Sequence, residues 1–238
     1  MGSLEKKQVL VIGGSSGIGL ATARLAAARG AIVTIASRSK TRLREALGTL
    51  PASAKTVSLD GRDEAAVESF FRSGSVWDHL VISGAETPMG SVRELPLRDA
   101  RAAMDSKFWG AYYVARAASL APNGSITLIS GFLSVRPRTK TGLQSAINAA
   151  LEALGRGLAL ELAPIRVNTI SPGLIATPLW AGMSNEEREA MYTRAANRLP
   201  IQRVGEPEDV ASLILEIATN GFATGSTVYL DGGGIIAS

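Results

Sequence analysis

The sequence contains no cysteine and a single histidine, His79. Without thiols the chain cannot form disulfides or use a cysteine nucleophile, and one histidine is too few for nearly every zinc site. We therefore expect no bound metal. His79 begins a predicted strand, at the edge of the sheet far from the expected site, so we do not expect it to act in catalysis.

Long apolar runs are also missing. No segment approaches the roughly 18 apolar residues that a membrane-spanning helix needs. The polar start of the chain, from Met1 to Gln8, has no signal-peptide pattern. We expect a cytoplasmic protein with no membrane partner.

The sequence has only a small excess of positive over negative charge. Lys and Arg number 25 against 21 Asp and Glu, which gives a net charge of +4. The basic residues are dispersed rather than gathered in a stripe, so no nucleic-acid partner is expected. Hydrophobic residues make up 46% of the chain, which excludes a disordered protein.

Short β-rich runs alternate with helical patterns along the chain. The expected strands are Val9–Ile12, Ala31–Ile35, Lys55–Leu59, His79–Ile82, Ser125–Ile129, Arg166–Ile170 and Thr227–Leu230. The expected helices are Ile18–Arg29, Glu64–Phe71, Arg98–Leu120, Gly142–Ala163 and Pro207–Ala218. This alternation predicts an α/β fold with one doubly wound, seven-stranded parallel sheet between helices. We expect a single domain over residues 1–238, with a lid-like segment at about 174–205.

A glycine-rich turn follows the first expected strand. It reads Gly13-Gly14-Ser15-Ser16-Gly17-Ile18-Gly19, and a helix begins directly after it. Glycines permit a tight turn and a close approach to a pyrophosphate, and the helix start offers free N–H groups to an anion. A turn that binds no ligand is the alternative. The strand–turn–helix context favours phosphate binding.

The spacing Gly13-x-x-x-Gly17-x-Gly19 resembles that of the short-chain dehydrogenase/reductase family. The resemblance continues through Ser37-Arg38, Asp60, Ser171-Pro172-Gly173 with Thr177, the stretch from Ile201 to Val210, and Asp231-Gly232-Gly233. It implies a Rossmann fold, a nicotinamide dinucleotide cofactor, a small-molecule substrate and a homo-oligomer, as a dimer or tetramer. The cofactor-binding residues that it implies are Gly13, Ser15, Ser16, Gly17, Ile18, Gly19, Ser37, Arg38, Asp60, Gly61, Ser83, Gly84, Asn148, Pro172, Gly173, Ile175 and Thr177.

The end of the second strand indicates which dinucleotide binds. An acidic residue there would select NAD by accepting hydrogen bonds from the 2′-hydroxyl. The segment instead contains Ser37 and Arg38 and no acidic residue. A guanidinium can pair with a 2′-phosphate, so NADP(H) is the predicted cofactor.

The residues at the family's catalytic positions depart from its pattern. The family uses a Ser, a Tyr, a Lys four residues after the Tyr, and an Asn. The resemblance places these roles on Gly131, Gln144, Asn148 and Lys107, and residues 130–163 contain no tyrosine. Side-chain amides do not titrate near neutral pH and cannot supply a proton. The ordinary carbonyl chemistry of the family should therefore be severely weakened.

Lys107 and Asn148 look like the family's Asn and Lys with their places exchanged. One hypothesis is that Lys107 reaches across to the place of the family Lys and is held by Asn148. The alternative is drift after loss of catalysis, with Lys107 pointing to solvent. The tentative catalytic residues are thus Lys107, Gln144 and Asn148. Two functions remain open: an NADP(H)-dependent oxidoreductase with a rebuilt site, or a non-catalytic NADP(H)-binding sensor or regulatory partner subunit.

Overall fold

The computed structural model describes residues 2–72 and 74–237. It contains one sheet with the strand order β3-β2-β1-β4-β5-β6-β7, and all six neighbouring pairs are parallel. The strands are β1 (Gln8–Ile12), β2 (Ile32–Ser37), β3 (Lys55–Ser58), β4 (Trp77–Ile82), β5 (Leu120–Ile129), β6 (Arg166–Pro172) and β7 (Thr227–Leu230). The predicted seven-stranded doubly wound sheet is confirmed.

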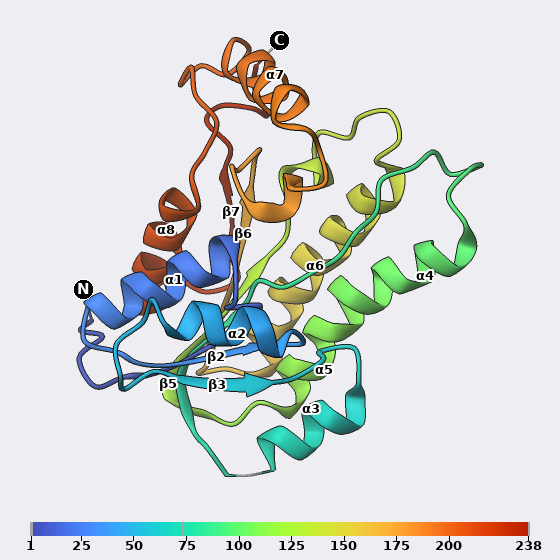
Figure 1. The fold of residues 1–238 in the computed structure, drawn as a ribbon. Coiled ribbons are helices and arrows are strands. Elements are labelled where there is room, and N and C mark those ends of the chain that lie inside the picture. The colour runs from blue at the N-terminus through green and yellow to red at the C-terminus, as the bar shows by residue number, and fades with distance from the viewer. Residues whose placement is uncertain (1, 73, 238) are drawn as a thin grey trace.

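Helices cover both faces of this sheet (Figure 1). They are α1 (Gly17–Ala28), α2 (Lys40–Leu47), α3 (Glu64–Phe71), α4 (Leu97–Met104), α5 (Gly110–Ala117), α6 (Gly142–Glu161), α7 (Asn185–Ala196) and α8 (Pro207–Thr219). One core packs α1, α2 and α8 against the sheet, and the other packs α3, α5 and α6 against the opposite face. Within the described residues, no helix is both long and apolar enough to cross a lipid bilayer.

The central strands are apolar at successive positions because both of their faces are buried. In β1, Val9 and Val11 belong to one core while Leu10 and Ile12 belong to the other. Successive side chains of a strand point to opposite faces, so an unbroken apolar run fills both layers. This run therefore places β1 in the middle of the sheet.

The long helix expected over Arg98–Leu120 is wrong in its middle and at its end. A π-helical turn, Asp105–Trp109, separates α4 from α5, and α5 ends at Ala117. Leu120 instead begins β5, where it pairs with Trp77 of β4. Pairing with β4 overrides the helical pattern of the local sequence.

The expected lid-like segment contains a 3₁₀ turn, Pro178–Trp180, and the helix α7. No residue of α7 is buried. The helix lies beyond the sheet, near the C-terminal end of the chain (Figure 1). The N-terminus of α7 is stabilised locally by a capping box between Ser184 and Glu187.

Strand order reverses at β1, which lies between β2 and β4. The connection from β1 leads to β2 on one side, and the chain later returns to β4 on the other side. Ligands of open parallel sheets bind at such a reversal, outside the carboxyl ends of the strands. The glycine-rich turn lies at this place.

Candidate cofactor and active site

The turn after β1 combines two close backbone contacts with an open helix start. A Cβ at Gly13 would lie 2.3 Å from the backbone N of Gly84, which follows β4, so only glycine fits there. Gly17 begins α1 with a positive φ of 50°. The preceding Ser16 makes no side-chain cap, and the first turn of α1 holds no acidic residue. The positive end of α1 is thus free to receive an anion.

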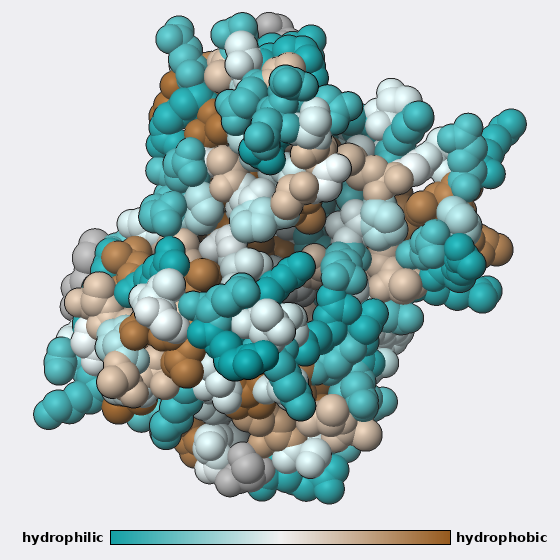
Figure 2. All heavy atoms as spheres, viewed as in Figure 1, coloured by the Kyte–Doolittle hydropathy of each residue, from teal (hydrophilic) through white to brown (hydrophobic). Residues whose placement is uncertain are grey.

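A cleft of about 660 Å³ opens in front of this turn. It is lined by most of the predicted cofactor-binding residues: Gly13, Ser15, Ser16, Gly17, Ile18, Ser37, Arg38, Asp60, Gly61, Ser83, Gly84 and Thr177. Five predicted residues do not line it: Gly19, Asn148, Pro172, Gly173 and Ile175. Hydrophilic side chains cover the middle of this face of the molecule (Figure 2).

Gly19 has a packing role instead. A Cβ at this position would lie 2.3 Å from the carbonyl oxygen of Gly13. The missing side chain lets α1 pack against the turn that precedes it. Gly173 is similar, because a Cβ there would lie 2.8 Å from the Cα of Asp231.

Charged pairs line the cleft beyond the ends of β2 and β3. Arg38 donates a hydrogen bond to Glu86, which follows β4. Arg62 donates to both carboxylate oxygens of Asp60, and these bonds hold the pKa of that carboxyl below its usual range. Ser15 Oγ lies 2.9 Å from Ser37 Oγ and joins the glycine turn to the end of β2.

Sequence reasoning missed four charged residues that line this cleft: Arg42, Glu45, Arg62 and Glu86. Arg42 and Glu45 lie on α2, which begins two residues after Arg38. Their spacing of three residues places them on one face of this helix, and this was the available signal. No local pattern pointed to Glu86. Arg38 follows β2 and Glu86 follows β4, and the two meet only because the sheet places these strands on either side of β1.

Lys107 and Asn148 are in contact beside the cleft. Lys107 Nζ donates to Asn148 Oδ1 at 2.7 Å and to the carbonyl oxygen of Ser130 at 2.7 Å. The lysine lies in the π-helical turn before α5, and Asn148 lies on α6. This contact agrees with the predicted proximity of the two residues and contradicts a Lys107 that points to solvent.

Burial lowers the pKa of Lys107 from its ordinary value of 10.5 to about 8, although the negative charge of Glu152 acts in the opposite direction. Removing an ammonium group from water disfavours its charged form. The Lys107 ammonium is therefore a stronger acid than that of an exposed lysine. Lys107 does not itself line the cleft, but the adjacent Ser106 does.

Gly131 and Gln144 are the other residues on which the resemblance to the family places catalytic roles. A Cβ at residue 131 would lie 2.9 Å from Asn148 Nδ2, so the glycine makes room for the asparagine. Gln144 Nε2 donates to the carbonyl oxygen of Thr87 at 2.6 Å, and its buried Oε1 has no partner among the described residues.

Glu152 is a buried carboxylate on α6 that the sequence analysis did not identify. It is 4% exposed and accepts four side-chain hydrogen bonds. The donors are the hydroxyls of Ser130, Ser134, Ser171 and Tyr229. An acidic residue on the buried face of a helix, one turn after Asn148, was the signal that could have found it.

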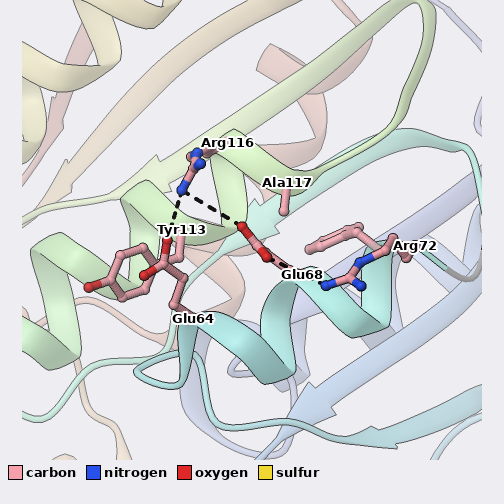
Figure 3. A pocket seen from close by; sticks show the side chains of 7 residues that line it. Glu64, Glu68, Arg72, Tyr113, Arg116 and Ala117 are labelled. Atoms are coloured by element: carbon pink, nitrogen blue, oxygen red, sulfur yellow. Dashed lines mark hydrogen bonds and ion pairs between the residues drawn. The ribbon is translucent and has the colours of Figure 1, made fainter.

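Two other features lie outside the cleft. His79 is buried in β4, its Nδ1 is 2.9 Å from Ser125 Oγ, and burial lowers its pKa to about 4. A second hollow, between α3 and α5, is lined by charged side chains that already pair with one another, since Arg116 contacts Glu64 and Glu68 (Figure 3). Across the described parts of the chain, no cluster of His, Cys, Asp and Glu could hold a metal ion.

Comparisons with known proteins agree with this architecture. Residues 13–234 match the family model described as Enoyl-(Acyl carrier protein) reductase. The short-chain dehydrogenase/reductase ATR9 of Stachybotrys chlorohalonatus is 32% identical over 99% of this chain and 100% of its own length.

Two solved structures extend the comparison. A small-chain dehydrogenase in complex with NADPH has a TM-score of 0.85 and 39% identity, over 98% of this chain and 100% of that one. The MalC reductase/Diels–Alderase from Malbranchea aurantiaca has a TM-score of 0.90 and 27% identity, over 98% of both chains. With this fold, this glycine turn and these relatives, the chain belongs to the short-chain dehydrogenase/reductase family of oxidoreductases.

Proposed function

We propose that this protein is an NADP(H)-dependent oxidoreductase for a small carbonyl or alcohol substrate, with a rebuilt active site. The observation that carries the proposal is the cleft, which gathers an uncapped helix N-terminus, a glycine turn and Arg38 at one edge of the sheet. The solved relative in complex with NADPH supports the choice of cofactor.

The residues present fit a dinucleotide phosphate. The open first turn of α1, with Ser15, Ser16 and Gly17, would hold the pyrophosphate. Ser37 and Arg38 would hold the 2′-phosphate. On the same model, Asp60 and Gly61 would contact the adenine, and Ser83, Gly84, Asn148, Pro172, Gly173, Ile175 and Thr177 would surround the nicotinamide half. When bound, NADPH supplies a hydride to the substrate carbonyl.

Lys107 is the proposed proton donor. Its ammonium has three N–H groups, of which Ser130 and Asn148 take two. On this proposal the remaining N–H would donate to a substrate oxygen that reaches past the cleft lining at Ser106. With a pKa of about 8, Lys107 is protonated at neutral pH and can release its proton more readily than an ordinary lysine.

Gln144 and Asn148 have roles that need no titration. Asn148 holds Lys107, while Gln144 is fixed by its hydrogen bond to Thr87 and can orient a polar ligand through an amide. Because no tyrosine takes part, reduction of simple ketones should be slow.

A non-catalytic NADP(H)-binding member, acting as a sensor or partner subunit, is the second candidate. The favouring observation is that Lys107 is engaged by two internal acceptors and does not line the cleft.

Nucleotide titration followed by a substrate-panel assay on the same sample separates the two candidates. Oxidoreductase function predicts NADPH binding, turnover of at least one carbonyl compound, and loss of that turnover in Lys107→Ala but not in Lys55→Ala, an exposed lysine outside the cleft. Binding without any turnover favours the sensor. A kcat on the order of 10 per second on a simple ketone would contradict the rebuilt site.

The proposal also includes the assembly and the surroundings of the molecule. We propose one domain in which residues 174–205 act as a lid, assembly into a homodimer or homotetramer through its helices, and a cytoplasmic location. Sedimentation analysis and cell fractionation test the last two points.

A further inference from the structure

Glu152 lies where three strands end. Its Oε1 accepts hydrogen bonds from Ser130 Oγ at 2.9 Å, Ser134 Oγ at 2.7 Å and Ser171 Oγ at 3.0 Å. Its Oε2 accepts one from the Tyr229 hydroxyl at 3.1 Å. These donors come from the end of β5, the turn after it, β6 and β7. One side chain of α6 therefore ties together the sheet edge beside the proposed nicotinamide half of the site.

This carboxylate is buried without an ion pair. Among the described residues, no Lys, Arg or His nitrogen lies within ion-pairing distance of it. Hydroxyl donors satisfy its oxygens but carry no charge, so the negative charge still requires compensation nearby. Lys107 is the cation on which Glu152 acts.

One hydrogen-bond acceptor of Lys107 is bonded to Glu152, and the other lies on the same helix as Glu152. Ser130 accepts from Lys107 through its carbonyl oxygen and donates to Glu152 through its hydroxyl. Asn148, the other acceptor, lies one helical turn before Glu152 on α6. The carboxylate thus fixes one partner of the lysine, lies one helical turn from the other, and supplies a negative charge that acts on it.

We propose that Glu152 is a positioning residue for Lys107, which holds the Ser130 acceptor of the lysine in place and keeps its half-buried ammonium charged. The inference rests on the proposed role of Lys107, but its physical content is independent of turnover. A purely structural Glu152 would join the strands without affecting how Lys107 titrates.

Other charged groups around this site do not take over the role. Tyr229 adjoins Glu152, and Arg156, one turn further along α6, acts on Tyr229. Asp105 lies on the same π-helical turn as Lys107, but Glu152 is the charged group that acts on this lysine. Removing the charge of Glu152 should therefore change the pKa of Lys107 directly.

The test is the pKa of Lys107, measured by NMR titration of isotope-labelled lysine side chains in the wild type and in Glu152→Gln. The chain has six lysines, and Lys107→Met identifies the signal. We expect Glu152→Gln to lower the Lys107 pKa by roughly one unit, because an opposing charge is lost. Glu161→Gln, the same change at an exposed position of α6, should leave it unmoved. An unchanged pKa in Glu152→Gln would overturn the inference.

Unfolding measurements keep the inference testable if Glu152→Gln is unstable. If the two charges compensate each other, the stability lost in Lys107→Met plus Glu152→Gln will be smaller than the sum of the two single losses. Additive losses would overturn it. NADPH titration of the wild type, run in parallel, tests the proposed function separately. If NADPH does not bind, the proposed function is contradicted, but the effect of Glu152 on the Lys107 pKa is still tested by the NMR titration.

Discussion

Arg38 carries the selectivity between the two dinucleotides in this account. It lines the cleft, and no acidic residue neighbours it in the chain where an NAD-type protein would place one. We predict that Arg38→Ala weakens NADPH binding roughly tenfold to a hundredfold, because hydrogen bonds to a charged group are lost, and leaves NADH binding nearly unchanged. Calorimetric titration with both nucleotides measures the effect. Arg44→Ala, on the same helix region but outside the cleft, is the control, and equal losses for both nucleotides would show that Arg38 does not read the phosphate.

Glu86 competes with the 2′-phosphate for the guanidinium of Arg38 in this account. Its carboxylate accepts a hydrogen bond from Arg38, so a 2′-phosphate must replace it as the partner of the guanidinium. Both side chains of this ion pair are exposed, and such pairs are weak. We predict that Glu86→Gln tightens NADPH binding by roughly 1.5- to 5-fold and does not change NADH binding. An NADPH affinity that stays the same or falls would count against competition between Glu86 and the phosphate.

The titration of Lys107 makes stability depend on pH in a particular direction. Its pKa falls from 10.5 in the unfolded chain to about 8 in the folded protein. Between these values the unfolded chain binds the proton more strongly, so the folded state gains stability as pH rises. Relative to Lys107→Met, the wild type should gain about 3 kcal/mol between pH 8 and pH 10.5. Denaturant unfolding at several pH values measures this gain, and parallel curves for the two proteins would refute the lowered pKa.

Among the elements, the junction of β5 with α6 decides the shape of the proposed active site. Gly131 lies two residues after the end of β5, and its missing Cβ leaves space for Asn148 of α6. We predict that Gly131→Ala displaces Asn148, weakens its bond to Lys107 and destabilises the fold by roughly 1–3 kcal/mol, as overpacking does. The measurements are thermal unfolding and the Lys107 signal in NMR.

Gly157→Ala is the matched control on α6. A Cβ at residue 157 meets nothing within 4 Å, so alanine should stabilise this helix by about 0.5–1 kcal/mol. If Gly131→Ala also leaves stability and the lysine signal unaltered, then Asn148 does not depend on the missing side chain.

Elements whose apolar pattern is local were predictable from the sequence. The apolar runs Val9–Ile12 in β1 and Leu80–Ile82 in β4 are continuous because both faces of the sheet are buried there, and the glycine turn marks the start of α1. The π-helical turn at Asp105–Trp109 was not predictable, since it depends on packing between α4, α5 and α6. The same turn brings Lys107 to Asn148, the contact that the exchanged residue types predict.

At the scale of the whole molecule, residues distant in sequence meet because the strands end at one edge. Arg38 and Glu86 face each other across the end of β1, and Ser130, Ser171 and Tyr229 meet at Glu152. No sequence motif connects Arg38 with Glu86, or Glu152 with its hydroxyl donors. Sequence reasoning therefore found Arg38 but not its contact with Glu86, and it did not find the cluster around Glu152. Lys107 lies beside the cleft at this same edge, so on the proposed function cofactor binding and proton transfer would occur close together.

The central claim is that this edge binds NADP(H). The most direct test is calorimetric titration of the wild-type protein with NADPH and, under the same conditions, with NADH. The account predicts that NADPH binds at least roughly tenfold more tightly, the difference that one charge-assisted contact to the 2′-phosphate supplies. Equal affinity for the two nucleotides, or no binding of either, would contradict it.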